Sequence, residues 1–502
     1  MPAFLSLLPI LSLLICLLAF KLSAAKASAL SFFVTFVIFL YYFRPGADGI
    51  AITIAKGCSL ALFVILITWG AMFLYNLVNE AKALDVINRN IEIALSNKFH
   101  QFILLSWAFA PFLQGIAGFG APVIVVTSIL VSMGFNPVAS SCAVLIGHSW
   151  AISFGSMGSS IYAIDMVTQS PINEIIVYMS YFGMLAMFFT GLAVCFIYGG
   201  IKYVAKGLPF VLFISIVMSI ALYILANLGV LSVISLLTGL TGFVAGFFVS
   251  RARGKGEERI RLYSAELNLF QAILPYLLTV IFSILFFILD PPFVIGVNFA
   301  GYETFFGLVV PQEVGYVKFN ILKFPFTIIM ISSFISMIVF YKKKTFNMRV
   351  AKSVIAKTAQ KCVSTTITLL FLLNIAVMMK DSGMIGQIAV SLASIFGKAY
   401  PLVAPLIGLL GAFITGSNTN SNIIFGSLQE IAAISIGAGT AVMCAAQSIG
   451  ASVGASMSPP MVAIGAIAAQ IQGNEGQIYR KNIISIFIII FILGVVNFLI
   501  LS

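Results

Sequence analysis

The sequence predicts an all-α membrane protein that crosses the bilayer many times. Of its 502 residues, 61% are hydrophobic and only 8% are charged, and the mean hydropathy is +1.13. A soluble domain carries about 25% charged residues, and no globular core absorbs this much apolar surface. The apolar residues also gather into separate runs suited to membrane helices, which need about 20 residues each. We therefore expect a multi-pass protein of the cell membrane with roughly 12 to 14 transmembrane helices.

The apolar runs follow one another along the whole chain. The first has no basic leader region and no clear cleavage site, so it is interpreted as a membrane helix and not as a removed signal peptide. The two runs that flank residues 114–122 are short, and we expect them to pair as a re-entrant hairpin. The clear runs lie near residues 3–20, 28–43, 58–78, 101–113, 121–133, 138–154, 178–200, 208–228, 230–250, 268–289, 322–341, 362–379, 400–415, 438–454 and 482–501.

Charged residues between the runs predict the orientation. The net charge of +12 comes from short basic loops, which are typical of cytoplasmic topology signals and not of nucleic-acid binding. One basic loop contains Arg251, Arg253, Lys255, Arg259 and Arg261. A second spans residues 342–361, and the acidic loop 290–320 lies between them, so that loop is predicted to be external. The chain thus divides into an N-terminal half (1–250), a cytoplasmic basic linker (251–265) and a C-terminal half (266–502).

Two interruptions of the apolar pattern are the candidate binding site. The segment 114–122 contains Gly115, Gly118, Gly120 and Pro122, which loosen a helix and free backbone N–H and C=O groups. Within a bilayer, such groups are tolerated only where they are buried in protein or line a cavity. The segment 415–422 holds a run of hydroxyl and amide side chains in apolar surroundings, where they need partners. A pair of interruptions in corresponding places is the best sequence pointer to a transporter's substrate site.

Each interruption supplies groups that suit a small anion. The glycine segment offers backbone N–H groups, Phe119 an apolar contact, and Gln114 a hydrogen bond. A weak repeat supports a site between two halves, because Gly155–Ser159 resembles Ala455–Pro459, although small residues also favour helix packing. The predicted substrate-binding residues are Gln114, Gly115, Gly118, Phe119, Gly120, Ser417, Asn418, Thr419, Ser421 and Asn422.

Three titratable residues are candidates for carrying a coupling proton. His148 lies within an apolar run, and histidine titrates near neutral pH, but a neutral histidine bonded between helices is an equal alternative. Asp381 follows Lys380, so an interfacial ion pair is as plausible as a proton site. Glu430 is the third candidate. The six cysteines are scattered without metal-ligand spacing, so neither a metal site nor a cofactor is predicted.

These motifs together resemble the bacterial and archaeal lactate permease family over nearly the whole chain. The family's Gly-Ala-Ala-Gly-Phe-Gly-Ala-Pro segment is matched from Gly115 to Pro122, and its Gly-Phe-x-Pro turn from Gly134 to Pro137. The later matches lie at 154–158, 415–422, 425–429 and 458–459. The resemblance implies symport of a small 2-hydroxymonocarboxylate, such as lactate or glycolate, with a proton. It also implies an ion-transporter type fold with inverted repeats and helical hairpins.

The sequence departs from the family pattern where charge is expected. Gln114 replaces an acidic residue before the glycine segment, Ala455 replaces a basic residue in the last motif, and His148 stands where asparagine is common. The anion is then expected to bind through backbone amides and the 417–422 side chains, or to enter as the protonated acid. A carrier for another organic anion or a sodium-coupled carrier is the alternative function. An intramembrane enzyme is remote, because no convergent acid, base or metal-ligand set is present, and no pore signature indicates a channel.

Overall fold

The structure is a computed structural model that describes residues 3–20, 22–94, 97–116, 118, 120–252, 266–289, 291–305 and 309–502. Among these residues, 10 helices are long and apolar enough to cross a membrane, or up to 12 if each of two bent pairs is one span. The predicted all-α, multi-pass fold is confirmed. The number of spans falls at or below the low end of the expected range, partly because the helices at Phe4–Leu17 and Ala121–Ser132 are shorter than a full span.

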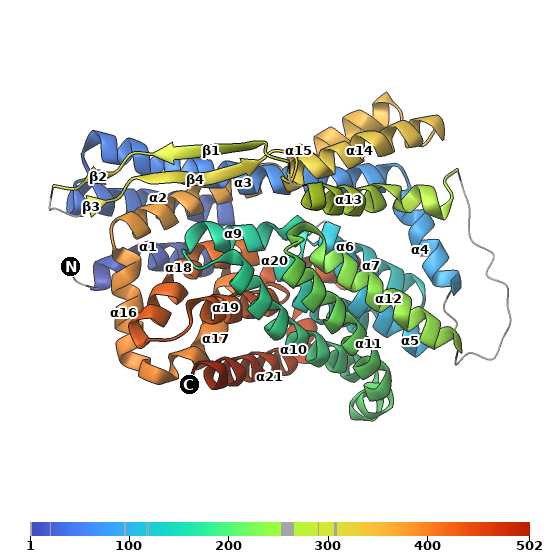
Figure 1. The fold of residues 1–502 in the computed structure, drawn as a ribbon. Helices are drawn as coiled ribbons and strands as arrows, with labels where there is room; N and C mark the ends of the chain where they lie inside the picture. The colour runs from blue at the N-terminus through green and yellow to red at the C-terminus, as the bar shows by residue number, and fades with distance from the viewer. Residues whose placement is uncertain are drawn as a thin grey trace.

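The helices form two layers (Figure 1). The first layer contains α2 (Ala24–Ile38) with η1 (Phe39–Phe43), α3 (Gly46–Glu80), α13 (Leu269–Leu289), α14 (Pro325–Lys342) and α15 (Met348–Asp381). The helix α1 (Ala3–Leu18) lies below this layer, against α2 and α16. In the centre of the layer α3 lies against α15, and a Cβ on Gly57 would collide with Asn374. Glycine at this position therefore allows the two long helices to approach closely.

The second layer contains the remaining helices of both halves. From the first half it holds α5 (Lys98–Leu104), η2 (Leu105–Phe109), α6 (Ala110–Ile116), α7 (Ala121–Ser132), α8 (Pro137–Gly147), η3 (Ser149–Phe154), η4 (Ser156–Gly158), α9 (Ser159–Val167), α10 (Ile172–Gly199), α11 (Ile201–Leu228), η5 (Leu231–Val233) and α12 (Ile234–Ala252). From the second half it holds α17 (Tyr400–Thr415), α18 (Asn418–Ile436), α19 (Thr440–Ala455), α20 (Pro459–Ala468) and α21 (Glu475–Leu501). Between the layers run α4 (Ala83–Ala94) and α16 (Met384–Phe396), the latter followed by η6 (Gly397–Ala399).

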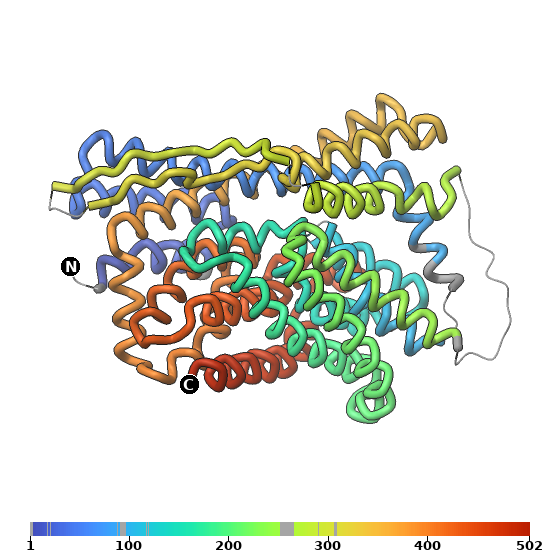
Figure 2. Tube along the Cα trace, in the orientation of Figure 1, coloured from blue at the N-terminus to red at the C-terminus, as the bar shows by residue number. Residues whose placement is uncertain are grey.

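A β-ribbon lies over the first layer, within the loop predicted to be external (Figure 2). Its strand β1 (Val294–Phe299) pairs antiparallel with β4 (Glu313–Asn320), and the short β2 (Tyr302–Glu303) pairs with β3 (Val309–Val310). The all-α prediction did not include these strands. The same loop's Asp290 lies outside the described residues, as do Arg253, Lys255, Arg259 and Arg261 of the predicted basic linker.

The two halves are inverted repeats, as the resemblance implied. The series α3, α4, α5–α6, α7, α8, α9 and α10 recurs as α15 to α21, each element about 300 residues later, which is the pattern of an internal repeat. The paired helices α3 and α15 are antiparallel. Lys56 near the start of α3 contacts Asp381 at the end of α15, whereas Glu80 at the end of α3 contacts Lys357 near the start of α15. Accordingly, α4 and α16 lie at opposite ends of the molecule (Figure 1).

Candidate functional site

Four interruptions of helices in the second layer occur at equivalent places in the two halves. The first separates α6 from α7, and the third, at Gly416 and Ser417, separates α17 from α18. The second lies between η3 and α9, and the whole segment Ser149–Val167 is bent by 43° relative to α8. The fourth lies between α19 and α20, which are bent by 40°. Left-handed backbone at Gly120 (φ 81°), Gly158 (φ 80°) and Gly416 (φ 76°) makes three of these turns possible.

Contacts connect these four interruptions into a closed ring, which we call the junction. A Cβ on Gly118 would collide with Ser156 Oγ, which joins the first interruption to the second. Asn418 Nδ2 donates to Ser153 Oγ at 2.7 Å, which joins the second to the third. A Cβ on Gly416 would lie 3.3 Å from Pro460 Cγ, and one on Gly120 would lie 2.7 Å from Ile464 Cδ1. The last two contacts join the third interruption to the start of α20 at Pro460 and the first interruption to the middle of α20 at Ile464.

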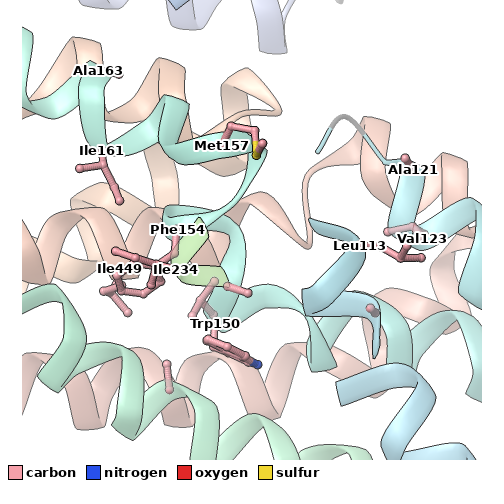
Figure 3. Packing of buried hydrophobic residues seen from close by; sticks show 14 of the residues in the cluster. Leu113, Ala121, Val123, Trp150, Phe154, Met157, Ile161, Ala163, Ile234 and Ile449 are labelled. Atoms are coloured by element: carbon pink, nitrogen blue, oxygen red, sulfur yellow. The ribbon is translucent and has the colours of Figure 1, made fainter. Parts of the chain in front are cut away.

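Figure 3 shows the first two interruptions side by side. Leu113 and Ala121, on either side of the first interruption, lie to the right of the turn that carries Phe154 and Met157. Buried apolar side chains surround this turn, and Phe154 and Met157 are themselves fully buried. The irregular backbone is therefore enclosed by protein, as unpaired backbone groups at membrane depth require.

A network of uncharged polar side chains occupies the side of the junction formed by η3, α9, α18 and α19. Ser153 Oγ accepts from Asn418 and donates to the Ser448 carbonyl at 2.8 Å. Asn422 Nδ2 donates to Ser448 Oγ at 3.0 Å and to the Ser160 carbonyl at 2.9 Å. The hydroxyls of Ser160 and Thr419 are 2.9 Å apart. Residues from both halves thus satisfy one another, which explains how the polar run in α18 is stable within an apolar layer.

Two acceptors in this network remain unsatisfied. Asn418 is 1% exposed and Asn422 is 0% exposed, and neither Oδ1 has a hydrogen-bond partner among the residues that the structure describes. An unpaired buried acceptor costs about 1–3 kcal/mol, so such groups usually mark a bound water, ion or ligand. The two residues are one helical turn apart on the same face of α18.

The predicted residues of the first interruption fall into two groups. Gln114 and Gly118 lie at the junction, since Cβ atoms on Gly155 and Gly118 would approach the Gln114 side chain to 2.7 Å and 3.2 Å. Gly120 is the N-cap of α7. Gly115 instead faces α12, where a Cβ would collide with the Leu236 backbone, so its role is helix packing. Phe119 lies outside the described residues.

The predicted residues of the third interruption are also divided. The interruption is limited to Gly416 and Ser417, because Asn418–Asn422 already belong to α18. Ser417 caps this helix by accepting from the Asn420 N–H at 3.3 Å. Asn418, Thr419 and Asn422 face the first half. Ser421 faces the other way and donates to the Gly408 carbonyl of α17 at 3.0 Å.

The three candidate proton carriers lie in three different places. His148 is buried between α8 and η3, where its Nδ1 is 2.5 Å from the Val144 carbonyl oxygen. Glu430 joins α18 to the end of α9: its Oε1 accepts from the Gln169 and Ser170 N–H groups at 2.8 and 2.7 Å and from Ser170 Oγ at 2.6 Å. Glu430 is therefore a connector between the two halves in this structure.

Asp381 belongs to an ion cluster in the first layer, together with Lys56 and Glu313. The Lys56 side chain is 0% exposed, and its Nζ lies 3.5 Å from Asp381 Oδ2 and 3.0 Å from Glu313 Oε2. Tyr302 of the ribbon donates to Asp381 Oδ2 at 3.3 Å. Burial, followed by the charge of Asp381, raises the pKa of Tyr302, so its phenol remains a proton donor. The ion-pair partner of Asp381 is thus Lys56, which is more buried than the adjacent Lys380.

A cavity of about 470 Å³ lies between the ribbon and α9. Its wall includes Glu313, Lys318 and Lys380 on the side of the first layer, and Asp165 on α9. The cavity therefore carries charges of both signs. It borders the ion cluster through Glu313.

Sequence reasoning missed Ser153, Ser448 and Ser160 at the junction, and Lys56 and Glu313 in the ion cluster. A lone serine in a helix carries no distinctive signal, because it is more often a packing residue. Lys56 did carry a signal, since an ionisable residue within an apolar run is a functional candidate by default.

Comparison with known proteins gives matches over almost the full chain. Residues 2–502 match the family model described as L-lactate permease. A protein named L-lactate permease from Streptococcus iniae is 29% identical over 86% of this chain and 90% of its own length. A protein named glycolate permease from Escherichia coli K12 is 25% identical over 99% and 95%. Among solved structures, the Alcanivorax borkumensis YdaH transporter, described as having an unusual topology, aligns with a TM-score of 0.50 at 12% identity, over 90% of this chain and 89% of that one.

Proposed function

Because this chain belongs to the L-lactate permease family, we propose that it is a secondary transporter of small 2-hydroxymonocarboxylates, with L-lactate and glycolate as the first candidates. The two relatives' names share one chemistry, a carboxylate with a hydroxyl on the adjacent carbon. The multi-pass fold, with ten to twelve candidate spans among the described residues, suits a protein of the cell membrane. The proposed binding site is the junction.

The observation that carries this proposal is the convergence of four helix starts on the junction. The helices α7, α9, α18 and α20 each begin directly after one of the four interruptions. A helix N-terminus presents unpaired N–H groups and a partial positive charge, and so favours a carboxylate. The start of α20 differs, because Pro459 and Pro460 have no N–H, so it contributes mainly the partial charge. Half-helices of this kind at a repeat interface commonly hold anionic substrates in transporters.

The segments that form the junction contain no acidic or basic residue. No Asp, Glu, Lys or Arg occurs in the four segments 114–122, 149–160, 415–422 and 447–460. His148 directly precedes the second segment. A carboxylate would consequently be held by backbone N–H groups and by hydroxyl and amide side chains. This arrangement requires no salt bridge, in agreement with Gln114 and Ala455 standing where the family pattern has charges.

Uptake by the purified protein in proteoliposomes tests the proposal. We expect accumulation of labelled L-lactate or glycolate, competition by the other 2-hydroxy acid, and little competition by dicarboxylates, which carry a second charge into an uncharged site. The Asn418→Ala variant should lower uptake. The matched control is Asn497→Ala, which removes a buried asparagine that donates to the Pro401 carbonyl, away from the junction. Absence of uptake of either acid under any imposed gradient would overturn the assignment.

A proton is the coupling ion that the family resemblance implies, and its transfer needs a titratable group. Of the three candidates, Glu430 is engaged by backbone N–H groups, and the His148 Nδ1 is close to a carbonyl. Asp381 shares Lys56 with a second carboxylate, which makes it the candidate best placed to exchange a proton. If it does so, Asp381→Asn should retain lactate exchange while losing accumulation driven by a pH gradient.

Sodium is the second candidate for the coupling ion. The observation that favours it is the pair of amide oxygens on α18 that have no hydrogen-bond partner among the described residues, in a junction whose segments contain no carboxylate side chain. Uptake with imposed sodium and proton gradients, applied separately, distinguishes the two ions.

A further inference from the structure

We propose that the cavity between the β-ribbon and α9 is an entry site that binds the small carboxylate before it reaches the junction, with Lys318 and Lys380 as the cations that receive it. The inference rests on the proposed function, because it adds a second anion site to the same transport route. Its starting point is the size of the cavity, about 470 Å³, within the range of about 300–1,000 Å³ that is usual for small-molecule sites.

The charged residues in the wall of the entry site are unequally paired. Glu313 is engaged by Lys56, whose Nζ lies 3.0 Å from Glu313 Oε2 behind the wall. Lys318, Lys380 and Asp165 have no ion-pair partner in the part of the chain that the structure describes. Two ammonium groups thus stand against one carboxylate, and a monocarboxylate balances the difference.

The charges around the two lysines limit how tightly the site holds an anion. Lys56 pairs with two carboxylates, so the ion cluster keeps one negative charge in excess. Asp381 carries part of that charge behind the wall, next to Lys380 in the sequence. Together with Asp165, this charge moderates the attraction of the lysines. Moderate attraction suits a site on a transport route, because the substrate must bind and also leave.

The ribbon is bent so that it covers the cavity. The pairing of β1 with β4 is irregular at Asn298, which alone faces residues 314–316 of β4. Left-handed backbone at Gly315 (φ 66°) and its N–H, which donates to Asn298 Oδ1 at 2.7 Å, hold this bulge. A Cβ on Gly315 would lie 2.7 Å from Lys318 Cε, so glycine leaves room for the lysine stem. As a result, residues 313–318 line the cavity consecutively, whereas a regular strand presents only every second residue to one side.

The helix α9 connects the entry site to the junction. Near its start, the Ser160 hydroxyl is 2.9 Å from that of Thr419 in the junction. Tyr162, Asp165 and Met166 of the cavity wall follow on the same helix. At about 1.5 Å per residue, Asp165 lies about 8 Å along the helix axis from Ser160. An anion beside Asp165 is therefore about one and a half helical turns from the junction.

The two sites divide the selection of the substrate between them. The lysines of the entry site attract negative charge over a distance, which raises the local concentration of the carboxylate and is weakened by salt. The junction, whose segments contain no acidic or basic residue, then holds the anion by hydrogen bonds alone. Loss of the lysines should consequently impair capture and leave the later steps intact.

Initial rates of L-lactate uptake into proteoliposomes test the entry site. In the double variant Lys318→Gln/Lys380→Gln we expect the KM to rise at least about fivefold at an unchanged Vmax, because only capture is impaired. Added choline chloride should raise the KM of the parent and leave that of the double variant unchanged. Lys318→Arg/Lys380→Arg keeps both charges and should restore the parent KM. The matched control is Lys343→Gln, at the exposed C-terminal end of α14. A double glutamine variant with the parent KM, or with a lower Vmax alone, overturns the proposal.

Chemical labelling tests the same site without transport. Val314 lines the cavity and is 74% exposed, so Val314→Cys places a thiol at its edge. On the purified full-length protein, an anionic sulfonatoethyl methanethiosulfonate should be favoured over the cationic trimethylammonioethyl reagent, relative to their rates with free cysteine, and L-lactate should slow the reaction. The double glutamine variant should lose this preference, and the protein without the added cysteine corrects for the native thiols.

The two measurements keep the entry site and the proposed function apart. A preference for the anionic reagent, without uptake of any 2-hydroxy acid by the parent, supports the entry site and refutes the proposed function. Uptake of L-lactate with the parent KM in the double glutamine variant, and without a preference for the anionic reagent, does the reverse.

Discussion

The junction in the second layer and the ion cluster in the first layer are both buried and polar, yet they consist of different kinds of side chain. The ion cluster has three charged side chains, and its Lys56 is completely buried between two carboxylates. The junction is built from serine, asparagine and glycine, without an acidic or basic residue in its four segments. In the cluster the charges face one another, whereas at the junction the side-chain oxygens of Asn418, Asn422 and Gln447 have no hydrogen-bond partner among the described residues.

This difference distinguishes buried polar groups that stabilise the fold from buried polar groups that can bind a ligand. Buried charges that are paired with one another make a region expensive to disturb, since removal of one partner leaves an uncompensated charge. Neutral groups left unpaired at the ends of broken helices are instead available to a ligand. We therefore expect loss of the buried cation Lys56 from the ion cluster to affect stability first, and substitutions at the junction to affect transport first.

The largest effect is expected for Lys56→Met. Two carboxylates would remain close together without their cation, which for a buried pair costs about 3–5 kcal/mol. Thermal unfolding in detergent should show a large decrease in Tm or a loss of folded protein. Adding Glu313→Gln and Asp381→Asn to the same chain removes the stranded charges and should restore much of the stability. A Lys56→Met protein as stable as the parent would show that the cluster is not a structural one.

A smaller effect on stability but a severe effect on transport is expected for Gly118→Val. A side chain here collides with Ser156 Oγ and forces the first two interruptions apart. Lactate uptake should fall at least about tenfold, the change that corresponds to about 1.4 kcal/mol. Gly386→Ala on α16 is the matched control, because a Cβ there has no neighbour within 4 Å. Normal uptake by Gly118→Val would place the substrate elsewhere.

An intermediate effect is expected for Ser153→Ala. The change removes the acceptor of Asn418 Nδ2 and the donor to the Ser448 carbonyl, and a buried group left unpaired costs about 1–3 kcal/mol. Uptake should fall by less than in Gly118→Val, up to about tenfold, while the protein remains folded. Ser333→Ala, which removes an equally buried hydroxyl without a described partner on α14, should change neither property. Equal behaviour of the two serine variants would contradict the role of the network.

The sequence was sufficient to predict the membrane fold and the first and third interruptions, because glycine, proline and polar runs are conspicuous in apolar surroundings. It was not sufficient to predict the extent of the third. Asn418–Asn422 can remain helical because Ser153, Ser160 and Ser448, from distant parts of the chain, satisfy their side chains. Nor could it pair Lys56 with Asp381, since the contact depends on the antiparallel placement of α3 and α15. Tertiary partners of this kind are absent from local patterns.

The smallest effect is expected for Glu430→Gln, and it distinguishes a connector from a proton carrier. The carboxylate accepts from two backbone N–H groups and one hydroxyl at the end of α9. Glutamine keeps one acceptor oxygen but replaces the other with a donor that faces the Gln169 N–H. Since charge-assisted hydrogen bonds are about twice as strong as neutral ones, we expect a loss of about 1–2 kcal/mol in stability. The ratio of lactate uptake with and without a pH gradient should stay that of the parent, because a connector carries no proton through the cycle. If the pH gradient no longer stimulates lactate uptake while the Tm is unchanged, Glu430 is instead the coupling residue. Proton transfer would then take place between the halves, at the contact of α18 with the end of α9.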